Sequence, residues 1–113
     1  MRKKAKILEK CLGKSCFLRD MVEYSPDSVV SKTILEKTTG TITLFSFDKG
    51  QGLSEHTSPY DAVVQVLEGT ADRTIDGEKL KVGAGELIIM PAEVPHAVLA
   101  EEKFKMLLIL IRA

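Results

Sequence analysis

Cysteine is scarce in this sequence, with only Cys11 and Cys16 among 113 residues. Four residues separate them, and this spacing is neither the redox C-x-x-C motif nor a zinc-binding pattern. We therefore expect two reduced thiols in a cytoplasmic protein.

Long apolar runs are missing as well. The first residues, MRKKAKILEKCLGKSCFL, are basic like the start of a signal peptide, but Glu9, Lys10 and Lys14 interrupt the apolar segment that a signal peptide needs. The longest apolar run, MLLILI at 106–111, has the length of a strand and is too short to span a bilayer. These absences predict a protein without a membrane segment.

An excess of charge of either sign is also lacking, because sixteen basic residues balance sixteen acidic ones. The balance is uneven along the chain: up to Arg19 there are seven basic residues and one acidic residue, so the remainder carries the acidic excess. An acidic body argues against nucleic acid as a partner. The basic arm could touch an anionic surface, but we expect a solvated terminus.

Short stretches typical of β-strands are frequent in the sequence. Apolar and β-branched stretches of strand length recur at 28–37, 41–47, 62–68, 70–75, 78–82, 86–90, 96–99 and 104–111. Between two of them, Asp76–Gly77 predicts a type I′ hairpin, since both central positions of that turn need a positive φ. With no convincing helix after residue 25, the pattern predicts an all-β sandwich or barrel over 26–113. Residues 1–25 form a basic N-terminal arm, with a short helix expected over 5–12.

Two spaced motifs flank the hairpin. The matching positions are Gly50, His56 and Gly69 in the first motif and Gly85, Pro91 and His96 in the second. Their spacings resemble the two motifs of the cupin superfamily, G-x5-H-x-H with a later E-x6-G, and G-x5-P-x-G-x2-H-x3-N. The resemblance covers roughly residues 28–111 and implies a small single-domain cupin. Its fold would be a jelly-roll β-barrel, also called a double-stranded β-helix, with a short N-terminal arm.

The metal ligands that this resemblance implies are incomplete. In metal-binding cupins, two histidines and a glutamate of the first motif and the histidine of the second bind one metal. Here Ser58 stands at the position of the second histidine and Ala62 at that of the glutamate. Only His56 and His96 remain of the four implied ligands.

Two neutral imidazoles without a carboxylate or thiolate make a poor closed site for zinc or iron, which usually take three or four protein ligands. Water or a substrate carboxylate could complete an open site around a weakly held divalent metal of unknown identity. Three interpretations of His56 and His96 stay open. They are metal ligands, or the walls of a metal-free ligand pocket, or a partly buried pair without a functional role.

Three further residues are candidates for contact with a ligand in the barrel. His56, Ser58 and Tyr60 share parity, so a regular strand turns them to one face unless Pro59 or a bulge breaks the alternation. Met90 is placed to line the cavity. Each has a simpler interpretation, with Ser58 as a satisfied hydroxyl, Tyr60 as a half-buried loop residue and Met90 as a soft core filler.

Neither a phosphate-binding loop nor a Ser-His-acid nucleophile motif is present in the sequence. We expect a small cupin that binds a small molecule in the barrel, around a weakly held divalent metal or without one. One alternative is a metal-dependent dioxygenase, isomerase or lyase with a reduced ligand set. Another is a non-catalytic sensor or accessory module, so whether the protein is an enzyme stays open.

A homodimer is also expected. The run FKMLLILI at 104–111 is apolar at consecutive positions, so a strand there needs cover on both faces. The barrel core covers one face, and a second copy of the chain would cover the other.

Overall fold

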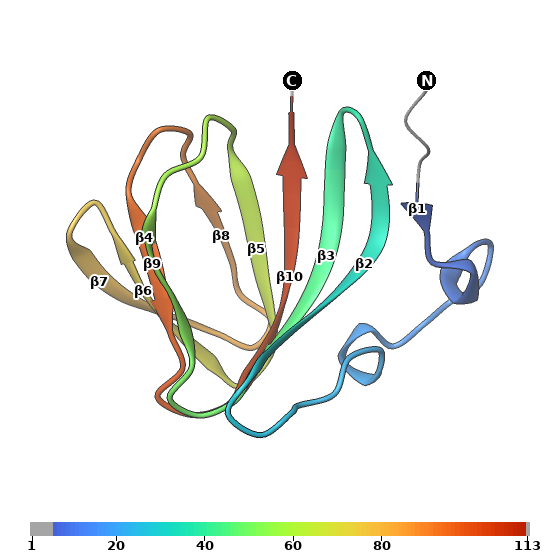
Figure 1. The fold of residues 1–113 in the computed structure, drawn as a ribbon, viewed down its shortest axis with the longest axis horizontal. Coiled ribbons are helices and arrows are strands. Elements are labelled where there is room, and N and C mark those ends of the chain that lie inside the picture. Colours follow the sequence, from blue (N-terminus) through green and yellow to red (C-terminus); the bar gives the residue numbers. More distant parts are fainter. Residues whose placement is uncertain (1–5, 113) are drawn as a thin grey trace.

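In the computed structural model, which describes residues 6–112, the chain forms two antiparallel β-sheets that face each other (Figure 1). The strands are β1 (Lys6–Ile7), β2 (Val29–Lys37), β3 (Gly40–Phe47), β4 (Gly52–His56), β5 (Ala62–Glu68), β6 (Thr70–Ile75), β7 (Glu78–Gly83), β8 (Leu87–Met90), β9 (His96–Leu99) and β10 (Phe104–Ile111). Two single turns of 3-10 helix, η1 (Glu9–Cys11) and η2 (Leu18–Asp20), lie in the N-terminal arm, and residues 6–112 contain no α-helix. The expected all-β class is confirmed.

The strands are not arranged in sequence order. The large sheet runs β1-β2-β3-β10-β5-β8, and the small sheet runs β4-β9-β6-β7. The chain therefore crosses repeatedly from one sheet to the other, as in a jelly roll. The last strand, β10, lies in the middle of the large sheet between β3 and β5 (Figure 1).

The core between the sheets follows from the alternation of side chains along the strands. In β5, Ala62, Val64 and Val66 are buried, and the residues between them face the outer side of the large sheet. Phe47 of β3 and Phe104 of β10 stack beside them, with ring centroids 4.6 Å apart. This alternation determines which side chains of each strand point between the sheets.

The predicted hairpin joins β6 to β7. Asp76 and Gly77 have φ values of 51° and 82°, and Ile75 pairs with Glu78 across the turn. Two consecutive positive φ values are what a type I′ turn requires, so this prediction is confirmed.

The N-terminal arm packs on the outer face of the large sheet. β1 pairs with β2, and farther along Val22 is buried against Leu44 of β3 and Leu107 of β10. The arm thus covers part of the face of β10 that the barrel core leaves open, where Leu107 is buried and Ile111 is exposed. The chain itself therefore provides part of the cover that we expected from a second copy.

Polar contacts fasten the arm to the sheet. The Tyr24 hydroxyl donates to Oε2 of Glu68 at 2.6 Å, and Nζ of Lys105 donates to the carbonyl oxygen of Arg19 at 2.6 Å. Burial, and then the hydrogen bond to Glu68, raise the pKa of the Tyr24 phenol, so it stays protonated and donates. Residues 18–25 therefore lie against the sheet, although Arg19, Asp20 and Glu23 remain exposed to solvent.

The short helix expected over 5–12 is wrong for the described part of that stretch. β1 and the single turn η1 occupy residues 6–11, and residue 5 lies outside the described residues. A helix this short is marginal without tertiary packing, and here pairing with β2 determines the conformation. No helix within residues 6–112 has the length and apolarity needed to cross a membrane.

Candidate functional site

His56 and His96 are direct neighbours across two strands. His56 ends β4, His96 begins β9, and the two residues lie opposite each other in the register. Their rings meet edge to face, with centroids 4.3 Å apart and planes 70° apart. The two motif histidines thus form one pair at the end of the small sheet.

A bulge in β4 turns His56 inward. Leu53 pairs with Val98 and His56 pairs with His96, so three steps along β4 match two steps along β9. The extra residue reverses the alternation. As a result Leu53 and His56, which have opposite parity, line the same cavity.

Hydrogen bonds to the backbone fix the tautomer of both rings. Nδ1 of His56 lies 2.7 Å from the carbonyl oxygen of Ser54, and Nδ1 of His96 lies 3.0 Å from that of Val94. Because a carbonyl oxygen only accepts, both Nδ1 atoms carry the proton. Each neutral ring then presents an unprotonated Nε2 as an acceptor or ligand atom.

The two rings differ in burial. His96 is 5% exposed, whereas the side chain of His56 is exposed to solvent. Desolvation lowers the pKa of His96, and the electrostatic effects of His56 and Arg73 lower it further, whereas the hydrogen bond that Nδ1 donates to the carbonyl oxygen of Val94 raises it. His96 is therefore a neutral imidazole at neutral pH.

The pair opens on a cavity of about 200 Å³ between the two sheets. Ser58 and Met90 line the same cavity. Most of the remaining wall is apolar, formed by Leu53, Ala62, Val98, Met106, Leu108 and Leu110. A ligand would therefore meet a few polar atoms in a largely apolar chamber.

Tyr60 does not line the cavity. It is 36% exposed, in the loop after β4, where its backbone N–H donates to Oγ of Ser58 at 3.2 Å. The strand ends at His56, so the alternation that relates His56 to Tyr60 no longer applies. Nearby, the N–H of Glu93 donates to the carbonyl oxygen of Ser58 at 2.7 Å, which ties this loop to the turn before β9.

The described residues do not fit a divalent metal held by protein ligands. Within residues 6–112 no three His, Cys, Asp or Glu side chains gather in one place. Asp61 is near in sequence, but its Oδ1 accepts a hydrogen bond from the N–H of Ala92 at 2.8 Å. Arg73 places a positive charge on the wall of the same cavity, which opposes a cation.

Arg73 itself is absent from the residues that the sequence predicts for the site. It lies on β6 and is 3% exposed, although its guanidinium is charged. Nη1 donates to Sδ of Met90 at 3.3 Å and Nη2 to Sδ of Met106 at 2.9 Å. Nε is buried without a partner among the described residues.

Burial lowers the pKa of Arg73 to about 10, so the side chain remains charged at neutral pH. One signal in the sequence could have found it. In TADRTI, Ala71 and Ile75 flank Arg73 at the same parity, so a strand that turns them to the core also turns Arg73 inward.

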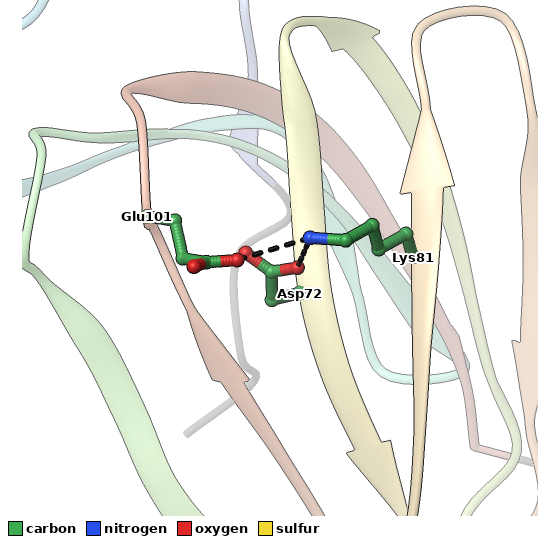
Figure 2. Close-up of polar contacts among 3 residues, drawn as sticks. All are labelled: Asp72, Lys81 and Glu101. Carbon is green, nitrogen blue, oxygen red and sulfur yellow. Dashed lines mark hydrogen bonds and ion pairs between the residues drawn. The ribbon is translucent and has the colours of Figure 1, made fainter.

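Three charges on the outer side of the small sheet are paired, in contrast to Arg73. Figure 2 shows the Lys81 ammonium reaching both Asp72, its cross-strand partner, and Glu101, at 3.0 Å from Oε1. The contact with Lys81 lowers the pKa of Asp72. These residues line an outer groove of about 470 Å³, to which Arg73 also contributes. The groove is larger than the cavity between the sheets, but these three charged groups already satisfy one another.

The chain is similar in sequence and in fold to known proteins. The model of the cupin domain family matches residues 43–112. A conserved protein of unknown function from Streptococcus pyogenes is 42% identical, with a TM-score of 0.84 over 88% of both chains. A cupin 2 conserved barrel domain protein from Leptotrichia buccalis is 45% identical, with a TM-score of 0.80 over 82% of this chain and 45% of that one.

A cupin superfamily protein from Desulfitobacterium hafniense is 28% identical, with a TM-score of 0.84 over 88% of this chain and 92% of that one. No protein with a curated description matches the chain. The family model covers more than half of the sequence and includes both histidines, and the fold is shared over nearly the whole chain. The chain therefore belongs to the cupin family.

Proposed function

We propose that this protein binds a small molecule in the cavity between its two sheets, and that His56 and His96 contact the ligand. The observation that carries this proposal is the histidine pair itself. Two rings 4.3 Å apart, both held by backbone carbonyls through Nδ1, present two Nε2 atoms at a cavity of about 200 Å³. Such preorganised polar atoms in an apolar pocket are typical of ligand sites.

The difference in burial suggests how a ligand would enter. His56 is exposed and lies at the rim, whereas His96 is buried behind it. A molecule that passes His56 would leave water and meet His96, Arg73 and the apolar wall. Binding without catalysis, as in a sensor or accessory module, needs nothing more than this.

A metal-dependent dioxygenase, isomerase or lyase remains the second candidate. Zinc and iron sites usually use three or four protein ligands, and the pair supplies two. The missing ligands would have to come from the substrate. The donor set therefore favours binding over metal-dependent turnover.

Methionine methyl groups offer a direct test of binding. Met90 and Met106 line the cavity, whereas Met21 packs on the outer face of the large sheet. In protein labelled with 13C at the methionine methyl groups, a library of small polar compounds should shift the Met90 and Met106 signals and leave Met21 unchanged.

Two variants assign the effect to the histidine pair. His56→Ala and His96→Ala should weaken the shifts, whereas Thr57→Ala, at an exposed neighbour that does not line the cavity, should not. The proposal fails if no compound moves the two cavity signals. It also fails if both histidine variants bind as the parent protein does.

A further inference from the structure

Within the described part of the chain, Arg73 is a buried charge without a counter-charge. Its three guanidinium nitrogens have two thioether sulfur partners and no oxygen partner within residues 6–112. Sulfur of this type is a weak acceptor. Burying a charged group without a strong partner is costly, and charged residues that stay buried are as a rule paired.

The position of the guanidinium shows where a partner would sit. Arg73, Met90 and Met106 all line the cavity beneath the histidine pair. The weak N–H···S contacts therefore lie at the wall of the chamber and could be exchanged for stronger ones. An anion in the cavity would supply the oxygen acceptors that the guanidinium lacks.

We propose that the ligand of this cavity is a small hydroxycarboxylic acid whose carboxylate accepts hydrogen bonds from Arg73. This proposal rests on the proposed function, because it names the class of molecule that the cavity would bind. A guanidinium and a carboxylate match in charge and in planar geometry. The wall of the cavity favours a monoanion, since Arg73 contributes a single guanidinium and no Lys, Asp or Glu side chain is among the residues that line it.

The hydroxyl group follows from the histidine tautomers. Both Nδ1 atoms donate to backbone carbonyls, so each ring in its neutral form can only accept through Nε2. A simple carboxylate has no hydrogen to offer them, whereas a hydroxyl on the same molecule does. Arg73 would therefore hold the acidic end and the histidine pair the hydroxyl end.

Size limits the molecule further. A volume of about 200 Å³ lies below the range of about 300–1,000 Å³ that is usual for ligand pockets. The cavity therefore suits a short-chain acid. The apolar wall leaves room for a few carbon atoms beside the polar groups.

Lactate, propionate and lactamide separate the two recognition elements. Propionate lacks the hydroxyl group, and lactamide lacks the negative charge. We expect lactate at millimolar concentration to raise the melting temperature and shift the Met90 and Met106 methyl signals. Propionate should do so more weakly, and lactamide and inorganic phosphate should do neither.

Variants then test each contact. Arg73→Met should weaken lactate binding by about tenfold or more, as expected for a lost hydrogen bond to a charged group. Arg73→Lys keeps the charge without the fork and gives a second folded variant to measure, with binding weaker than in the parent. His96→Ala should remove the preference for lactate over propionate. Lys81→Met, in the outer groove, is the matched control and should bind as the parent does.

The outcomes distinguish this inference from the function on which it rests. If neutral compounds shift the two cavity signals and carboxylates do not, the carboxylate is wrong and small-molecule binding stands. Retained lactate affinity in both Arg73 variants, or phosphate binding as tight as lactate binding, would also overturn it. If no compound of any kind reaches the cavity, both proposals fall.

Discussion

Nη2 of Arg73 lies 2.9 Å from Sδ of Met106, so a charged side chain of β6 reaches across the core to a strand of the opposite sheet. The contact joins the small sheet to the centre of the large one. It is also shorter than the 3.3 Å contact of Nη1 with Met90, and its acceptor is a neutral sulfur atom. The two sheets thus meet around a charge that the core does not neutralise.

Replacing that charge should stabilise the ligand-free protein. Arg73→Met fills similar space without a buried charge, and the free energy of unfolding should rise by about 1–3 kcal/mol. Urea denaturation of the parent and the variant measures this difference. An equal or lower free energy for the variant would mean that Arg73 has a stabilising partner in the folded state.

Stability should fall on mild acidification because of His96. Its pKa in the folded protein lies below the ordinary value of 6.5, through burial and then the nearby charges of His56 on β4 and Arg73 on β6. Below about pH 6.5 the unfolded chain therefore binds a proton that the native ring resists. Stability contributed by the neutral ring is complete above that pH and is lost as the pH falls toward the folded pKa.

Melting temperatures between pH 7.5 and pH 5 test this expectation. His96→Gln removes the titrating ring, so its melting temperature should fall less across this range than that of the parent. Carboxylates titrate alike in both proteins and cancel in the comparison. Parallel curves for the two proteins would contradict the expected shift.

Two motif glycines should differ sharply in their tolerance of alanine. Gly69 has φ +77°, and a Cβ there would lie 2.6 Å from the carbonyl oxygen of Lys103 and 2.9 Å from Cβ of Phe104. Gly85 has φ +87° with nothing within 4 Å of an added Cβ. Gly85→Ala should cost about 1–2 kcal/mol from backbone strain alone, and Gly69→Ala clearly more. Equal urea midpoints for the two variants would show that the chain at Gly69 moves aside freely.

A homodimer stays a prediction, and we expect the edge strand β8 to form its interface. Leu87 and Ile89 of β8 are 56% and 59% exposed on the edge strand of the large sheet, and they pair with Gln65 and Val63 of β5. Light scattering at micromolar concentration should give the mass of a dimer, and Leu87→Ser with Ile89→Ser that of a monomer. Leu12→Ser, at an exposed leucine of the arm, is the control. A monomer mass for the parent protein would refute the dimer.

The strands could be predicted from the sequence where the information is local. Alternating apolar residues and turn residues such as Asp76–Gly77 mark β2, β3 and β5 to β10. β4 carries no such signal, because GLSEH has only one partly buried residue, Leu53. Its place is set by pairing with β9, which is a tertiary effect.

The site could be predicted only in part from the sequence, because some of its geometry is also a tertiary effect. Motif spacing brings His56 and His96 together, but the bulge that turns His56 inward depends on the register with β9. Tyr60 escapes the expected alternation because the strand ends before it. The inward position of Arg73 could be predicted from the alternation around it. A charged residue is rarely assigned to a core without a known partner, however.

The central place of β10 has a consequence for synthesis of the protein on the ribosome. β3 and β5 each pair with β10 along most of its length, so the middle of the large sheet is vacant until residues 104–111 have left the exit tunnel. Earlier strands can form hairpins such as β6–β7, but their apolar inner faces stay exposed until β10 completes the large sheet. Non-local pairing of this kind slows folding and exposes strand edges. Nascent chains that end before Phe104 should thus depend on chaperones.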